Sequence, residues 1–203
     1  MAKFIAKYLR WAPKTAAGVE GTSFPTYGEA MDMGPLASVV ETINNNRAEN
    51  FGDGELQEFA DRFVSVALAV TVTEMPIDTA AAVFGTTKTA SGGLSFGVDD
   101  VAPEGGLGLI SGVQLPKKYG NKSVYQGVFY PCVKASRQGG SFNGDASNLS
   151  FVNSNCEFTG TAEENGKYTV MSQHFDTIAQ AQAWVEKMLK GGEPALAEAK
   201  AAT

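Results

Sequence analysis

Few side chains in this sequence could carry out chemistry. The single histidine, His174, lies two residues after Ser172, but no nucleophile-elbow motif surrounds that serine, so a hydrolase triad is not predicted. One histidine and two distant cysteines, Cys132 and Cys156, do not have the close ligand spacing of a zinc site. Both cysteines fall in strand-like segments, and we expect them to be reduced, buried side chains.

The remaining candidate motifs also fail. The acidic pairs Asp99-Asp100 and Glu163-Glu164 are expected to be solvated rather than to form an acid/base dyad. The glycine-rich stretch 105–112 lacks the Gly-Lys-Ser/Thr ending of a phosphate loop, so its glycines indicate a strand that bends or approaches another backbone closely. The sequence therefore predicts no catalytic residue, no cofactor-binding residue and no metal ligand, and hence a protein that is not an enzyme.

Composition narrows the class of protein further. The chain has 203 residues, of which 43% are hydrophobic and 23 are glycine, which fits one β-rich domain with a real core. The net charge is -6 with no cluster of Lys and Arg, so tight binding of nucleic acid is disfavoured. The sequence has no signal-peptide pattern and no membrane-spanning apolar run, so the expected location is the cytoplasm where the chain is made.

The clearest periodicity predicts a strand from Arg62 to Thr73. Alternate residues give it an apolar face (Val64, Val66, Leu68, Val70 and Val72) and a face of small residues (Ser65, Ala67, Ala69, Thr71 and Thr73, with Phe63). The small face could form a lightly packed interface or line a lumen.

Other strands and two helices complete the expected fold. A helix is predicted from Pro76 to Phe84 and stopped by Gly85, and an amphipathic helix follows Thr177 and ends at Gly191-Gly192. Further strands are expected at 3–11, 36–43 (ended by Asn44–Asn46), 105–114, 123–134, 149–159 and 167–175, the last two paired through a turn at 163–166. Pro131 suggests an edge position or a bulge. Long loops are expected at 13–35, 44–59 and 86–93, and a flexible tail at 191–203.

The order of these segments resembles the major tail proteins, or tail-tube proteins, of long-tailed non-contractile phages. The matching pieces, spread over about residues 36–190, are Phe51-Gly52-Asp53-Gly54, Ile77 to Gly85, Pro103 to Ile110, Val124 to Lys134, and Phe175-Asp176-Thr177 into Ala183-Trp184-Val185. Phe51 and Gly52 replace the Tyr-Ala of the family's YADN-like segment, and Gly54 replaces its Asn.

The resemblance implies a mainly β protein: a β-sandwich or half-barrel with a short helix and a C-terminal amphipathic helix, forming one domain over 1–203. It implies hexameric rings that stack into a tail tube, in a virion assembled in the host cytoplasm. The implied partners are further copies of the chain, the tape-measure protein, the tail terminator, and baseplate or distal tail proteins, with no membrane. DNA would pass through the lumen without specific binding. Subunit contacts are expected at Phe24, Tyr27, Asn50, Phe51, Gly52 and Asp53.

Two alternatives stay open. A related ring-former of a contractile injection or secretion system would share the fold. A glycan- or host-binding β-sandwich module would use exposed loop aromatics, for which Phe24, Tyr27, Tyr119 and Phe142 are the candidates.

Overall fold

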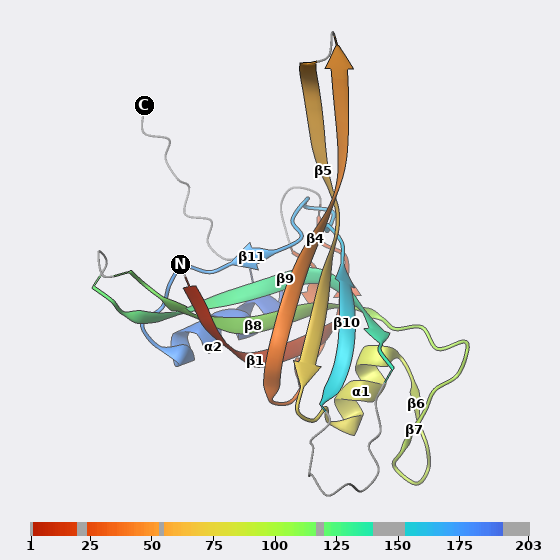
Figure 1. The fold of residues 1–203 in the computed structure, drawn as a ribbon. Coiled ribbons are helices and arrows are strands. Elements are labelled where there is room, and N and C mark those ends of the chain that lie inside the picture. Colours follow the sequence, from red (N-terminus) through yellow and green to blue (C-terminus); the bar gives the residue numbers. More distant parts are fainter. Residues whose placement is uncertain (1, 20–23, 53–54, 117–119, 140–152, 193–203) are drawn as a thin grey trace, which may run out of the picture.

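The computed structural model describes residues 2–19, 24–52, 55–116, 120–139 and 153–192, and these form a mainly β protein (Figure 1). The predicted fold class is thereby confirmed. The elements are β1 (Ala2–Ala16), β2 (Thr26–Tyr27), β3 (Met31–Asp32), β4 (Leu36–Gly52), β5 (Glu55–Val72), α1 (Ile77–Phe84), β6 (Thr87–Lys88), β7 (Leu94–Ser95), β8 (Glu104–Gln114), β9 (Ser123–Arg137), β10 (Ser154–Gly160), β11 (Val170–Met171) and α2 (Ile178–Leu189).

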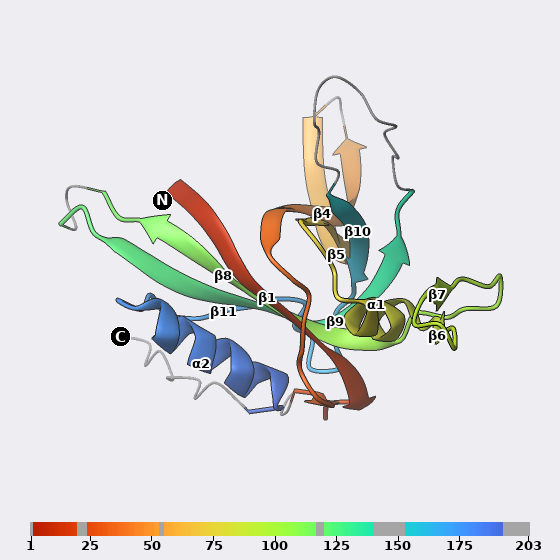
Figure 2. The same cartoon turned by 90° about the horizontal axis from the view of Figure 1, so that it is seen from below.

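One curved antiparallel sheet organises the molecule. Its strand order is β2-β1-β8-β9-β10-β5-β4, with β3 added on β1 and β11 on β9. The sheet bends so strongly that the β1-β8-β9 side and the β10-β5-β4 side stand at an angle to each other (Figure 2). The main core fills this angle, because its buried residues come from both sides, among them Trp11, Leu107, Tyr130, Leu68 and Phe158.

The helix α2 covers the opposite face of β1, β8 and β9 (Figure 2). It contributes Ala181, Val185, Met188 and Leu189 to a second core cluster with Ile110 and Phe129. Glycines in the sheet allow this close contact: a Cβ placed on Gly108 would lie 2.5 Å from Cγ1 of Val185, and one on Gly127 would collide with the ring of Trp184. Gly108, within the glycine-rich stretch, thus permits a close approach, although its neighbour is a side chain of α2 and not another backbone as predicted.

Both helices begin and end where the sequence predicts. Pro76 precedes α1, and Gly85 ends it in the left-handed conformation with φ 64°. Thr177 caps α2 by accepting a hydrogen bond from the Gln180 backbone N–H at 3.4 Å. At the other end, Gly192 and Gly191 donate to the carbonyls of Lys187 and Met188, both at 3.0 Å, which is the Schellman arrangement.

The strand boundaries differ more from prediction. Asn44–Asn46 do not end a strand, because β4 continues to Gly52 and pairs with β5 through a bulge between Asn44 and Asn45. The expected loop 44–59 is therefore wrong: most of it is a β hairpin. The asparagines bond across this hairpin, from Asn44 to Ser65 at 3.2 Å and from Asn45 to Asp61 at 3.3 Å. Cross-strand hydrogen bonds thus keep in a strand residues that favour turns in isolation.

Other predicted connections also contain strands. The expected loop 13–35 contains the end of β1 and the short strands β2 and β3. The expected loop 86–93 contains β6, which pairs with β7 directly after the loop. The expected pairing of 149–159 with 167–175 is wrong, since β10 and β11 each pair with β9 instead. Pro131 does not mark an edge strand, because β9 is central; it lies where the β8–β9 register shifts, so the bulge is confirmed. The predicted tail 191–203 lies outside the described residues from position 193 on.

Among the described residues, no helix is long and apolar enough to cross a membrane.

Candidate assembly surfaces

The β4–β5 hairpin extends away from the rest of the chain as an arm, here residues 44–62 without 53–54 (Figure 1). Its described side chains from Asn44 to Glu49 and from Ala60 to Arg62 are exposed. The base of the arm is fixed by Phe63, whose ring stacks on Tyr168 with centroids 4.0 Å apart and planes 12° apart. The arm is therefore anchored at its base, and its side chains are exposed at the positions 44–49 and 60–62.

Two sheet edges have unpaired stretches in the described part of the chain. The strand β4 is the last strand of the sheet and pairs only with β5. At the other end, β2 and β3 pair with β1 from Arg10 onward, so among the described strands the segment from Ala2 to Lys7 pairs only with β8. Unpaired edges of this length expose backbone donors and acceptors that can pair with another chain.

A bulge separates the free and covered parts of β1. The register with β8 shifts between Lys7 and Arg10, and Tyr8 takes a left-handed conformation with φ 58°. The Tyr8 hydroxyl donates to Glu186 of α2 at 2.6 Å, and the Arg10 guanidinium lies 3.3 Å from the same carboxylate. Burial and the bond to Glu186 raise the pKa of Tyr8, so this hydroxyl stays a donor. Contacts from α2 thus hold a backbone conformation that a tyrosine rarely adopts.

An exposed face of β4, β5, β10 and β9 is formed almost entirely by small residues. We call it the small-residue face, and its cross-strand rows are Ser38-Thr71-Asn155, Val40-Ala69-Glu157-Ser136, Thr42-Ala67-Thr159-Lys134 and Asn44-Ser65. Val40 is 59% exposed on it. Within these rows, only Glu157 and Lys134 carry charge, so the face is close to neutral.

The burial pattern of β5 confirms most of the alternation predicted for this strand. Val66, Leu68, Val70 and Val72 are at most 1% exposed and belong to the core. Val64 was predicted to join them and is instead 55% exposed. The bulge opposite it, where Asn44 pairs with Ser65 and the next pair is Asn45 with Phe63, leaves Val64 without a facing residue at the base of the arm.

Two predicted subunit-contact residues pack inside the chain. The rings of Phe24 and Tyr27 meet Phe129 edge-on, with centroid distances of 6.4 and 5.7 Å. The Tyr27 hydroxyl donates to the Pro131 carbonyl at 2.7 Å, and burial raises the pKa of this tyrosine. Both side chains thus tie the N-terminal region to β9, which also removes them as exposed aromatics for a glycan site. A subunit contact at either residue stays a prediction.

The other predicted contacts lie on the arm. Asn50, Phe51 and Gly52 end β4, where they pair with Glu58, Leu56 and Glu55 of β5. Asp53 lies outside the described residues, as do the candidate aromatics Tyr119 and Phe142. The structure thus brings Asn50–Gly52 together at the far end of the arm and places Phe24 and Tyr27 in the body.

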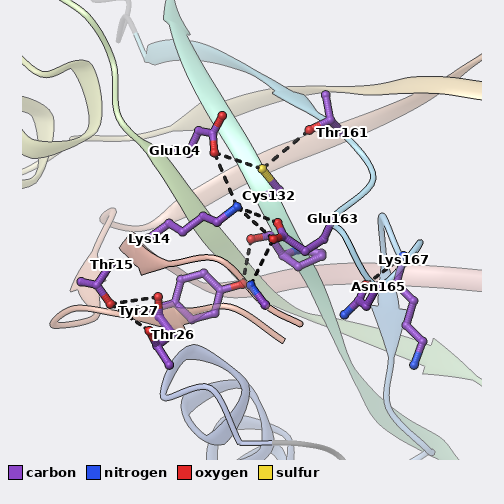
Figure 3. Close-up of polar contacts among 12 residues, drawn as sticks. Lys14, Thr15, Thr26, Tyr27, Glu104, Cys132, Thr161, Glu163, Asn165 and Lys167 are labelled. Atoms are coloured by element: carbon purple, nitrogen blue, oxygen red, sulfur yellow. Dashed lines mark hydrogen bonds and ion pairs between the residues drawn. The ribbon is translucent and has the colours of Figure 1, made fainter. Parts of the chain in front are cut away.

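A buried ion pair, unexpected from the sequence, joins the end of β1 to the loop after β10 (Figure 3). Lys14 Nζ lies 2.9 Å from both carboxylate oxygens of Glu163 and 3.6 Å from Glu104. The Glu163 side chain is 1% exposed, so the prediction that this acidic pair is solvated is wrong for Glu163. Burial is the largest single effect and lowers the pKa of Lys14, but the bond to Glu163 and the nearby groups Cys132, Glu163 and Glu104 together outweigh it, so the pKa is raised. The two partners are 149 positions apart, so no local pattern could reveal the pair.

Three of the potentially reactive side chains, those of Cys132, Cys156 and Ser172, are buried. Cys132 and Cys156 are free and buried, as predicted, and burial raises the pKa of each thiol, that of Cys156 to about 12. Ser172 donates to the Gln173 carbonyl at 2.6 Å and accepts from the Gly127 N–H at 2.8 Å, while His174 is exposed. No group of three or more His, Cys, Asp or Glu in the described ranges is placed to hold a metal ion.

Comparison with known proteins adds no relative. No protein-family model matches the sequence, and no curated protein matches it either.

Proposed function

We propose that this chain is a structural subunit that assembles with copies of itself into stacked rings, forming the tail tube of a phage. The observation that carries the proposal is the 17-residue edge strand β4. It begins in the main sheet and continues into the projecting arm, where it forms one of the two strands (Figure 1). A long, exposed and regular edge is an aggregation hazard in a protein that acts as a monomer. Closure of identical copies into a ring pairs or covers such edges.

The two unpaired edges suit a head-to-tail contact. The edge of β4 and the Ala2–Lys7 part of β1 are different surfaces, so copies joined through them repeat around an axis rather than stopping at a dimer. The hexameric number comes from the resemblance to tail-tube proteins and not from these contacts.

The near-neutral charge of the small-residue face supports the proposal that this face lines the lumen of the tube. Its rows carry one carboxylate and one ammonium, and the chain as a whole has a net charge of -6. A wall without a cationic stripe does not hold a polyanion, so DNA can slide along it. The tape-measure protein would occupy the same channel before the DNA passes.

The test is direct observation of the assembled state. The purified chain is examined by sedimentation velocity and negative-stain electron microscopy over a range of protein and salt concentrations. Rings or tubes with a central channel are expected. Monodisperse monomers under every condition, together with particle preparations that contain no tube of this chain, would overturn the proposal.

A ring-former of a contractile system would show the same edges and arm. Purification from the source particle distinguishes it, because that alternative predicts a contractile sheath around the tube.

A further inference from the structure

An open cleft lies between the two sides of the bent sheet. It has a volume of about 270 Å³, and its walls come from β1, β4, β8 and β9. Pockets for small molecules usually have volumes of about 300–1,000 Å³. The cleft is just below this range, so it suits a ligand of the size of an amino-acid side chain.

Glu41 places a carboxylate in this cleft, on the core side of β4. It pairs with Leu68, and Val39, two residues earlier, pairs with Val70. Leu68 and Val70 are at most 1% exposed, and residues paired across two strands share a face of the sheet. Glu41 is therefore directed toward the core side, where it lines the cleft. It forms no ion pair with any described residue.

Two buried hydroxyl groups complete the polar part of the cleft. Tyr130 is 3% exposed, and burial, the charge of Glu41 and a hydrogen bond to its carboxylate raise the pKa of this tyrosine. The Tyr130 hydroxyl therefore stays protonated and donates to Glu41. Ser111 is 5% exposed and lines the same cleft, yet its hydroxyl has no hydrogen-bond partner within the described part of the chain. A hydroxyl buried in this way favours a bond to a molecule in the cleft.

The floor of the cleft is apolar. Leu109 and Val128 pair across β8 and β9 and are 6% and 3% exposed. Together with Val39 they form a surface that fits a short hydrocarbon stem. A carboxylate beside such a surface complements a cation carried on a stem, and a primary ammonium has three donors to share between Glu41 and Ser111.

We infer that this cleft binds a linear alkylammonium group, with its nitrogen at Glu41 and Ser111 and its hydrocarbon stem over Leu109 and Val128. Two sources present this group, a free aliphatic diamine and the side chain of a lysine in a bound protein. The carboxylate rejects anions, and the apolar floor favours an ammonium that carries a stem. The inference goes beyond the proposed function and does not depend on ring assembly.

Calorimetric titration of the purified chain tests the site. The probes are cadaverine and Nα-acetyl-lysine methylamide, which presents a lysine side chain without other charges. We expect binding at a single site per chain with a Kd of about 1 mM or below. Pentanol and pentanoate should bind at least about tenfold more weakly, because they lack the positive charge. Tighter binding of cadaverine identifies a free diamine as the ligand, and tighter binding of the other probe identifies a lysine side chain.

Two variants locate the binding site. Glu41→Gln keeps the shape of the side chain and removes its charge, so it should weaken binding of both probes at least about tenfold. Ser111→Ala should weaken it at least about threefold. The matched control is Glu157→Gln, which removes the same charge on the small-residue face, where Glu157 pairs with Ala69, and should bind like the wild type. Circular dichroism and thermal unfolding establish that the variants are folded.

Three results would overturn the inference: a wild type that binds neither probe, equal binding of pentanol, or a folded Glu41→Gln variant that binds like the wild type. Glu41 would then be an inward-pointing charge that protects the edge strand β4 from unwanted pairing. Ring formation is measured separately, so none of these results bears on the proposed function.

Discussion

At the scale of single residues, the stability of the protein should depend strongly on the buried ion pair of Lys14 and Glu163. Replacing Glu163 by Gln removes the carboxylate that lies 2.9 Å from Lys14 Nζ and leaves that charge mostly buried. We expect the free energy of unfolding to fall by about 3 kcal/mol, because the remaining carboxylate near Lys14, that of Glu104 at 3.6 Å, is more than half exposed and offsets only part of the desolvation cost. Urea unfolding measures the loss.

The control for this prediction removes both charges. Lys14→Met with Glu163→Leu should be less destabilising than Glu163→Gln alone, since no unpaired charge is left behind. A single variant that loses less than about 0.5 kcal/mol would contradict the prediction, because that is the usual range for surface changes.

The buried thiol of Cys156 makes stability depend on pH in the alkaline range. Burial raises its pKa from 9.0 to about 12, so the folded state keeps a proton that the unfolded state releases. The contribution is complete below pH 9 and is lost as the pH rises toward 12, by up to about 4 kcal/mol. Stability of Cys156→Ala measured from pH 8 to 12 should fall less steeply than that of the wild type. Parallel curves would contradict this.

At the scale of elements, helices were predictable to within a residue or two, and strand boundaries were not. Thr177, Gly85 and Gly191 act locally, so caps and stops could be read from the sequence. The arm was missed because Asn44–Asn46 are turn formers in isolation, and only pairing with β5 makes them a strand. The burial of Phe24 and Glu163 was missed for a similar reason: Phe129 and Lys14, their partners, are distant in sequence.

The close contact between α2 and the sheet depends on two glycines, Gly108 and Gly127, because a Cβ at either position would collide with α2. Gly127→Ala would place a methyl group against the ring of Trp184, and Gly108→Ala would do the same to Val185. We expect Gly127→Ala to destabilise the protein by about 2 kcal/mol, since overpacking shifts the helix or strains rotamers. Gly139→Ala is the control, because its Cβ would meet nothing within 4 Å. Equal melting temperatures for the two variants would contradict this role of Gly127.

At the scale of the whole molecule, the small-residue face could line a channel or be buried between copies. Val40 and Ala69 face each other across β4 and β5 on that exposed surface, so two lysines there should leave the monomer folded. If the face lines a lumen, Val40→Lys with Ala69→Lys still assembles, because the edge of β4 pairs through its backbone while these two side chains lie on the face of the sheet. The tubes would then bind DNA in a salt-dependent way that wild-type tubes do not, because the lysines displace counterions from phosphates. Electron microscopy and a DNA-retention assay at increasing salt measure both effects. Loss of assembly in a folded variant would instead place this face between copies and rule out the lumen.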